Sequence, residues 1–107
     1  MGMTPSPLTR EGVEERLRAV EHEIRALGVA RLALFGSVLH GSARPDSDVD
    51  LLVQFVRGAK TFDRFVRLGE LLEQRLGHRV ELVTTESLSP FIGPRILADA
   101  QDVLRAA

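Results

Sequence analysis

Apolar residues recur along most of the chain, either at the three- and four-residue spacing of an amphipathic helix or in the short runs typical of buried strands. The first helical stripe predicts one helix, with Thr9 as its N-cap and Gly28 as its stop. A second stripe predicts a helix from Phe62 to Leu76 that Gly77 closes. The apolar positions of the first stripe are Val13, Leu17, Val20, Ile24 and Leu27.

Three apolar runs predict strands, because each is short and is bounded by glycine or by turn-forming residues. The runs are Val29–Phe35, Val49–Phe55 and Val80–Val83. Residues 38–47 are rich in turn-forming types, so at most a short helical turn fits after Ser37. Residues 84–90 predict a loop, and the apolar positions between Ile92 and Leu104 predict a last helix.

Length and charge restrict the class of protein. The 107 residues suffice for one domain, which we expect to span residues 9–107 after a flexible leader of residues 1–8. Fourteen Lys and Arg stand against 15 Asp and Glu, so the positive field of dedicated nucleic-acid binders is absent and we expect no direct nucleic acid binding. The chain has no cysteine, which excludes thiol catalysis and Cys-containing metal sites. Without a membrane-length apolar run or a secretory signal, we expect no membrane association and a cytoplasmic location.

Asp48 and Asp50 form an Asp-x-Asp pair at the start of the second predicted strand. Side chains alternate along a strand, so both carboxylates are expected on one face, with their Cα atoms roughly 7 Å apart. Such a pair can bind one divalent cation or bridge two, and hard oxygen ligands favour Mg²⁺ or Mn²⁺. The alternative is a solvated strand edge without a ligand.

Two further features extend this hypothesis. Gly36 and Ser37 follow a predicted strand directly, where free backbone N–H groups and a hydroxyl can hold phosphate oxygens. Glu81, in the third predicted strand, is the candidate for a third carboxylate, and Glu86 in the following loop is a weaker rival. The alternative for Gly36 and Ser37 is that they form an ordinary turn without a ligand. The alternative for Glu81 is that it is a surface glutamate without a catalytic role.

The segment Gly36-Ser37, ten residues, then Asp48-Val49-Asp50 matches the G-S-x(10)-D-x-D signature of a known superfamily. On these residues the chain resembles the DNA polymerase β-like nucleotidyltransferases, and its length is similar to their minimal branch. The resemblance implies an α/β (α+β) fold, a small mixed β-sheet with helices packed on it. It also implies ATP as substrate and two Mg²⁺ ions. The implied catalytic and metal-binding residues are Asp48, Asp50 and Glu81, and the implied nucleotide-binding residues are Gly36, Ser37 and Ser47.

The resemblance further implies a reaction and a partner. In the minimal branch, AMP is transferred from ATP to a tyrosine hydroxyl of a small helical HEPN toxin, and the nucleotidyltransferase acts as the antitoxin. One alternative is a catalytically weak antitoxin that blocks its partner by contact alone. Another is a transferase that acts on a small hydroxylated molecule such as an aminoglycoside.

The chain departs from the family pattern at two places. Glu81 stands where many relatives have aspartate, which lengthens the third carboxylate by one methylene. Leu39-His40-Gly41 stands where many relatives have Ala-Arg-Gly. Because histidine is mostly uncharged at neutral pH and cannot form a bidentate clamp, we expect His40 to replace the arginine only in part, with Arg44 as a candidate to compensate. The alternative is that both are solvent-facing loop residues.

Overall fold

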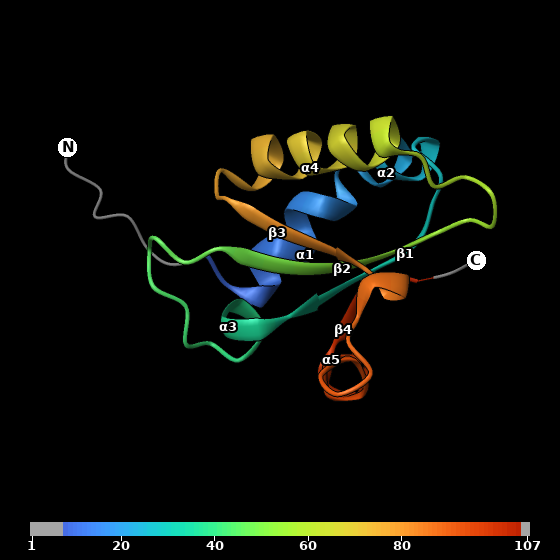
Figure 1. Cartoon of the computed structure of the whole chain (residues 1–107). Coiled ribbons are helices and arrows are strands. Elements are labelled where there is room, and N and C mark those ends of the chain that lie inside the picture. Colours follow the sequence, from blue (N-terminus) through green and yellow to red (C-terminus); the bar gives the residue numbers. More distant parts are fainter. Residues whose placement is uncertain (1–7, 106–107) are drawn as a thin grey trace.

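A single four-stranded sheet is the centre of the structure, a computed structural model that describes residues 8–105 (Figure 1). Residues 1–7 of the predicted leader lie outside the described part, whereas Leu8 is buried in the core. The elements in chain order are α1 (Arg10–Arg18), α2 (Glu21–Ala26), β1 (Val29–Phe35), α3 (Gly36–Leu39), β2 (Val49–Phe55), α4 (Phe62–Leu76), β3 (Val80–Thr84), the 3₁₀ helix η1 (Thr85–Ser87), α5 (Gly93–Asp99) and β4 (Gln101–Leu104).

The strand order across the sheet is β3-β2-β1-β4. Strand β1 is antiparallel to both of its neighbours, β2 and β4, while β2 and β3 run parallel. The long α4 connects these two parallel strands, as a crossover between parallel neighbours requires. The sheet is therefore mixed and carries helices, which confirms the predicted fold class.

The predicted elements with strong local signals are confirmed. Strands β1 and β2 and helix α4 have the predicted bounds, and β3 extends one residue further, to Thr84. The Thr61 hydroxyl accepts a hydrogen bond from the backbone N–H of Arg64 and so caps the start of α4. At its end Gly77 adopts a left-handed conformation with φ of 69°, which stops the helix.

The prediction of one continuous helix from Thr9 to Gly28 is wrong, because the chain turns at Ala19 and Val20 between α1 and α2. No glycine or proline marks this break. Both halves nevertheless keep their apolar stripes buried, and α1 packs on α4 while α2 packs on β1. Packing against two different surfaces, rather than local sequence, places the turn.

The prediction of a last helix through Leu104 is also wrong at its end. Helix α5 stops at Asp99, Ala100 is extended, and β4 then pairs antiparallel with β1, with Leu104 opposite Leu32. An ion pair between Arg31 and Asp102 joins the two strands. The strand forms because β1 offers a free edge whose backbone groups need partners. The helical spacing of the apolar residues does not compete with that pairing beyond Asp99.

The helices α1, α2 and α4 cover one face of the sheet, and α5 lies on the other side (Figure 1). The core forms on the helix-covered face, where alternate strand residues meet the apolar stripes of the helices. Among the fully buried side chains of this core are Leu17, Ile24, Leu34, Leu51, Val53, Leu68 and Leu72.

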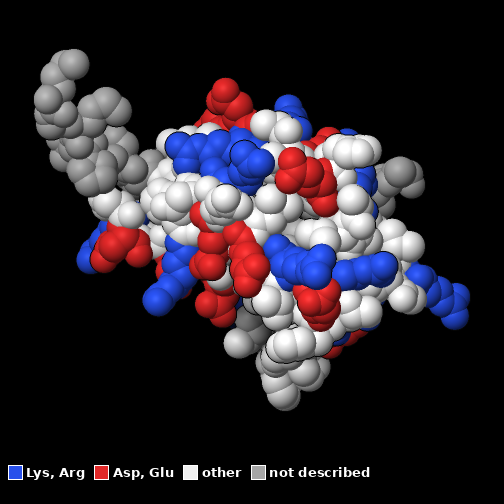
Figure 2. All heavy atoms as spheres, turned by 90° about the horizontal axis from the view of Figure 1, so that it is seen from above, with Lys and Arg blue, Asp and Glu red and all other residues white. Residues whose placement is uncertain are grey.

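Charges of both signs are interspersed over the outer surface of the helical layer, which Figure 2 shows from above. This view agrees with a net charge of −1 and shows no large single-sign field on this face. Within residues 8–105, no helix has the length and apolarity to cross a membrane.

Candidate active site

The predicted site residues gather where the end of β1 meets the beginnings of β2 and β3. Phe35 pairs with Asp50 across the first ladder, and Asp50 pairs with Glu81 across the second, so the three lie in one row across the sheet. Residues 49 and 51 on either side of Asp50 belong to the core. Because side chains alternate along a strand, Asp50 and Glu81 share the face opposite the core. Asp48 lies just before β2 begins, two residues ahead of Asp50. We call the carboxylates of Asp48, Asp50 and Glu81 the acidic row.

Gly36 packs directly against the carboxylate of Asp50. Its φ is 77°, a left-handed conformation that L side chains rarely adopt, and a Cβ placed on it would overlap Oδ2 of Asp50. Glycine is therefore needed at this position both for the backbone turn and for the close approach. The contact places the turn after β1 beside the acidic row.

The turn continues into α3, in which Ser37 directly follows Gly36. The carbonyl oxygen of Ser37 accepts a hydrogen bond from the backbone N–H of Ser42 at 3.0 Å. Its side-chain hydroxyl makes no hydrogen bond within the described residues, so it is available to a ligand. Ser47 differs, because its hydroxyl accepts from the backbone N–H of Arg44 at 2.7 Å and helps to close the turn that leads into Asp48.

Burial raises the pKa of the Asp50 carboxyl above its ordinary value, and the nearby charges of Glu81 and Asp48 raise this pKa further. None of these three carboxylates has an ion-pair partner within residues 8–105. The row is thus a place where negative charges repel one another without a compensating side chain.

This donor set fits a divalent cation. Three carboxylates are the hard oxygen ligands that Mg²⁺ prefers, and a cation would relieve the repulsion that raises the pKa of Asp50. In the described residues, however, no group of three acidic or histidine side chains is already drawn together tightly enough to enclose an ion. The side chains would therefore have to turn inward when an ion binds.

The other candidates lie elsewhere. Glu86 follows the far end of β3, on η1, and pairs with Lys60 at 3.3 Å, so the row contains Glu81 and not Glu86. His40, at the end of α3, contacts Asp99 with 2.5 Å between Nε2 and Oδ2. Asp99 carried no signal in the sequence, because only the fold brings it beside α3. Arg44 is exposed in the loop before Ser47.

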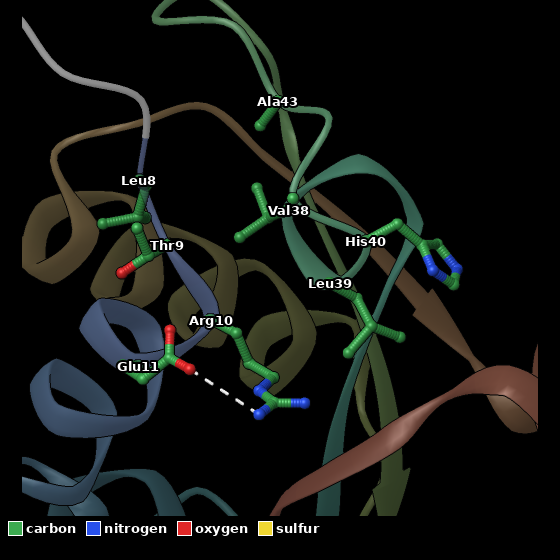
Figure 3. Close-up of a pocket in the computed structure, with 9 residues that line it drawn as sticks. Leu8, Thr9, Arg10, Glu11, Val38, Leu39, His40 and Ala43 are labelled. Atoms are coloured by element: carbon green, nitrogen blue, oxygen red, sulfur yellow. Dashed lines mark ion pairs between the residues drawn. The ribbon is translucent and has the colours of Figure 1, made fainter.

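A cavity of about 290 Å³ lies between the start of α1 and α3, and Figure 3 shows its lining. Leu8, Val38 and Leu39 supply much of the apolar wall, and Arg10 forms an ion pair with Glu11 at its edge. None of the three carboxylates of the row lines it. The cavity is therefore separate from the acidic row, although α3 borders it.

A mixed sheet with a glycine-serine turn packed beside carboxylates matches the arrangement expected for a nucleotidyltransferase. Residues 14–103 match the family model described as a nucleotidyltransferase domain. The chain belongs to this nucleotidyltransferase domain family.

Known relatives agree with this assignment. The chain is 41% identical over 93 residues to the protein adenylyltransferase MntA of Thermococcus cleftensis, covering 86% of this chain and 93% of the relative. A solved structure described as a minimal nucleotidyltransferase is 39% identical, with a TM-score of 0.76 over 87% of this chain and 94% of that chain.

A more distant match is a complex of a tri-AMPylated HEPN toxin with an MNT antitoxin from Shewanella oneidensis. The identity is 18% and the TM-score 0.63, over 88% of this chain and 73% of that chain. At this identity the likeness shows a common fold.

We expect Gly36→Ala to destabilise the fold more than Gly58→Ala. Both glycines have positive φ, of 77° and 79°, but a Cβ at Gly58 meets open space while one at Gly36 overlaps Asp50. Gly58→Ala should lose about 1 kcal/mol from backbone strain, and Gly36→Ala about 1 to 3 kcal/mol more from the overlap. Denaturant unfolding measures both, and equal losses would mean that Asp50 does not lie against the turn.

Asp50→Asn should raise the melting temperature at pH 7 in the absence of divalent cations. The pKa of Asp50 is raised in the folded chain, so its ionised form destabilises the fold once the pH exceeds that pKa. The gain should shrink as the pH falls toward about 4, where the carboxyl of the unfolded chain also becomes protonated. Asp46→Asn, at an exposed loop position, is the control. A melting temperature for Asp50→Asn that stays at or below wild type at pH 7 contradicts the prediction.

Proposed function

We propose that this chain transfers AMP from ATP to a hydroxyl group of a partner protein, and that the partner is a small helical HEPN toxin. The observation that carries the proposal is the packing of the Gly36 turn on Asp50, with Glu81 in register beside it. In this arrangement the turn would bind the triphosphate and the carboxylates would bind the metal at the same point of the sheet.

The relatives support a protein acceptor. The Thermococcus cleftensis relative is named a protein adenylyltransferase, and the Shewanella oneidensis complex contains an AMPylated toxin. The family match over residues 14–103 includes the turn and all three carboxylates of the candidate site. A partner protein would bring its own hydroxyl to this site.

The reaction is an in-line displacement at the α-phosphorus of ATP. The acceptor oxygen forms a new bond to phosphorus, the bond to the bridging oxygen breaks, and pyrophosphate leaves with the electron pair. Backbone N–H groups of the turn and the hydroxyl of Ser37 orient the triphosphate. The hydroxyl proton passes to a carboxylate, for which Glu81 at the outer position of the row is the candidate.

Asp48, Asp50 and Glu81 would hold the Mg²⁺ ions of such a reaction. When bound, these ions supply charge neutralisation for the triphosphate and lower the pKa of the attacking hydroxyl. Ser47 orders the turn before Asp48 through its bond to Arg44 and so supports the placement of the first carboxylate.

The decisive experiment incubates the purified chain with α-labelled ATP, Mg²⁺ and the protein product of the neighbouring gene. Label on the partner, at a tyrosine identified by mass spectrometry, is the expected result. A complex that forms without label would indicate an antitoxin that acts by contact alone. In a parallel incubation with an aminoglycoside as acceptor, label on the aminoglycoside with none on the protein would indicate a small-molecule transferase.

The carboxylate row gives a graded prediction for the same assay. Asp48→Asn and Asp50→Asn should each abolish transfer without unfolding the chain, because each removes the charge of a metal ligand. Glu81→Gln should slow the chemical step by about 100-fold or more and leave ATP binding largely in place, whereas Glu81→Asp should retain activity.

Glu86→Gln is the matched control for Glu81, because Glu86 lies beyond the other end of β3 and pairs with Lys60. It should transfer label at the wild-type rate. Wild-type transfer by Glu81→Gln together with an inactive Glu86→Gln would show that the third carboxylate is Glu86.

Ser37→Ala should weaken ATP binding while the melting temperature stays near that of the wild type. One hydroxyl donor to a charged phosphate contributes about 1 to 3 kcal/mol, or roughly a 5- to 150-fold change in Kd. Calorimetric titration with ATP and Mg²⁺ measures the change in Kd. Ser87→Ala is the control, because the Ser87 hydroxyl donates to the carbonyl of Thr84, the last residue of β3. An unchanged Kd would leave Ser37 without a phosphate-binding role.

A further inference from the structure

We propose that His40 is a positioning residue for the triphosphate turn and that it acts through its contact with Asp99. The inference rests on the proposed function, since it concerns how the turn that begins at Gly36 is held in place. It assigns a role to the histidine that stands in the signature segment at the end of α3.

The contact joins two elements that are otherwise loosely connected. Nε2 of His40 lies 2.5 Å from Oδ2 of Asp99, the last residue of α5, across 59 residues of sequence. Within residues 8–105, this is the one hydrogen bond or ion pair between a side chain of α5 and another element. Helix α5 lies on the side of the sheet opposite α4 (Figure 1), so the link braces α3 from that side.

Backbone hydrogen bonds around α3 couple the position of His40 to the turn that begins at Gly36. The N–H of His40 donates to the carbonyl of Gly36 at 3.2 Å, and the N–H of Ser42 donates to that of Ser37 at 3.0 Å. Helix α3 is a single turn, so its end and its start move together. Val38 attaches the middle of α3 to the core, where its side chain is buried. His40 is exposed and attaches the end of α3 to α5.

Asp99 is the charged group that contacts His40, and most of the other charged side chains on the adjoining elements pair elsewhere. On α1, Arg10 and Glu11 line the cavity that His40 borders, but they pair with each other, and Arg10 also donates to Gln101 at 2.9 Å. Figure 3 shows the ring of His40 directed away from Leu8 and Thr9 at the start of α1. Among the charged groups on the adjoining elements, Asp102 on β4 pairs with Arg31 across the sheet, and Arg95 on α5 makes no ion pair within the described residues. Arg44 follows α3 in the exposed loop.

A half-exposed pair of this kind contributes little to global stability. The side chains of His40 and Asp99 are 55% and 48% exposed, and exposed ion pairs contribute between about 0 and 1 kcal/mol. A small displacement of a phosphate-binding turn, in contrast, directly changes substrate binding. The role therefore predicts an effect on ATP affinity without a matching loss of stability.

The experiment measures ATP affinity in the presence of Mg²⁺ by calorimetry for His40→Ala, Asp99→Ala and the double variant. Each single variant should raise Kd about two- to fivefold, and the double variant should be no worse than either, because both remove one contact. Melting temperatures should match the wild type. His22→Ala, at an exposed position on α2, is the control and should bind ATP normally.

His40→Gln supplies the readout that a purely structural role would not move. A glutamine side-chain amide can donate a hydrogen bond to the Asp99 carboxylate, so His40→Gln should bind ATP with an affinity closer to that of the wild type than His40→Ala does. This rescue should disappear when both variants also carry Asp99→Ala.

Unchanged ATP affinity in His40→Ala, additive effects in the double variant, or parallel losses of melting temperature would each overturn the inference. Failure of the proposed function looks different. A wild-type chain that binds ATP but labels no acceptor refutes the transfer reaction and leaves the variant affinities informative. A wild-type chain that binds no ATP overturns both proposals.

Discussion

The close packing of the turn after β1 on the carboxylate of Asp50 is the contact on which the candidate site depends. It requires a residue without a side chain at Gly36 and a strand register that places Asp50 at the end of β1. The same register places Glu81 beside Asp50, so the site gathers negative charge that no side chain of the described residues neutralises. The hydrophobic core on the opposite face must hold the sheet together against this repulsion.

Helix α3 connects the parts of the molecule that the site needs. Its first residue packs on Asp50, its third is buried in the core, and its C-cap residue reaches α5. A single helical turn with three such attachments has little freedom to move independently. His40, in the signature segment, thus forms a contact between distant parts of the chain.

Local signals in the sequence were sufficient for most of the elements and for the site segment. Apolar runs bounded by glycine predicted β1 and β2 with the observed bounds, and capping residues marked both ends of α4. The spacing between Gly36-Ser37 and the Asp48–Asp50 pair indicated the family. These features depend on residues close together in the chain, where backbone conformation and side-chain alternation decide the outcome.

Four features required the tertiary structure. The break between α1 and α2 arises because the two segments pack on different surfaces, and β4 forms because β1 has an edge to pair. Strand pairing brings Glu81 rather than Glu86 to Asp50, and the fold alone brings Asp99 to His40. The sequence by itself determined which strand residues share a face, which residues cap the helices and where the chain forms turns, because those properties are local. Partners across the sheet and between helices were decided by the register and packing of segments distant in the chain, which no local pattern specifies.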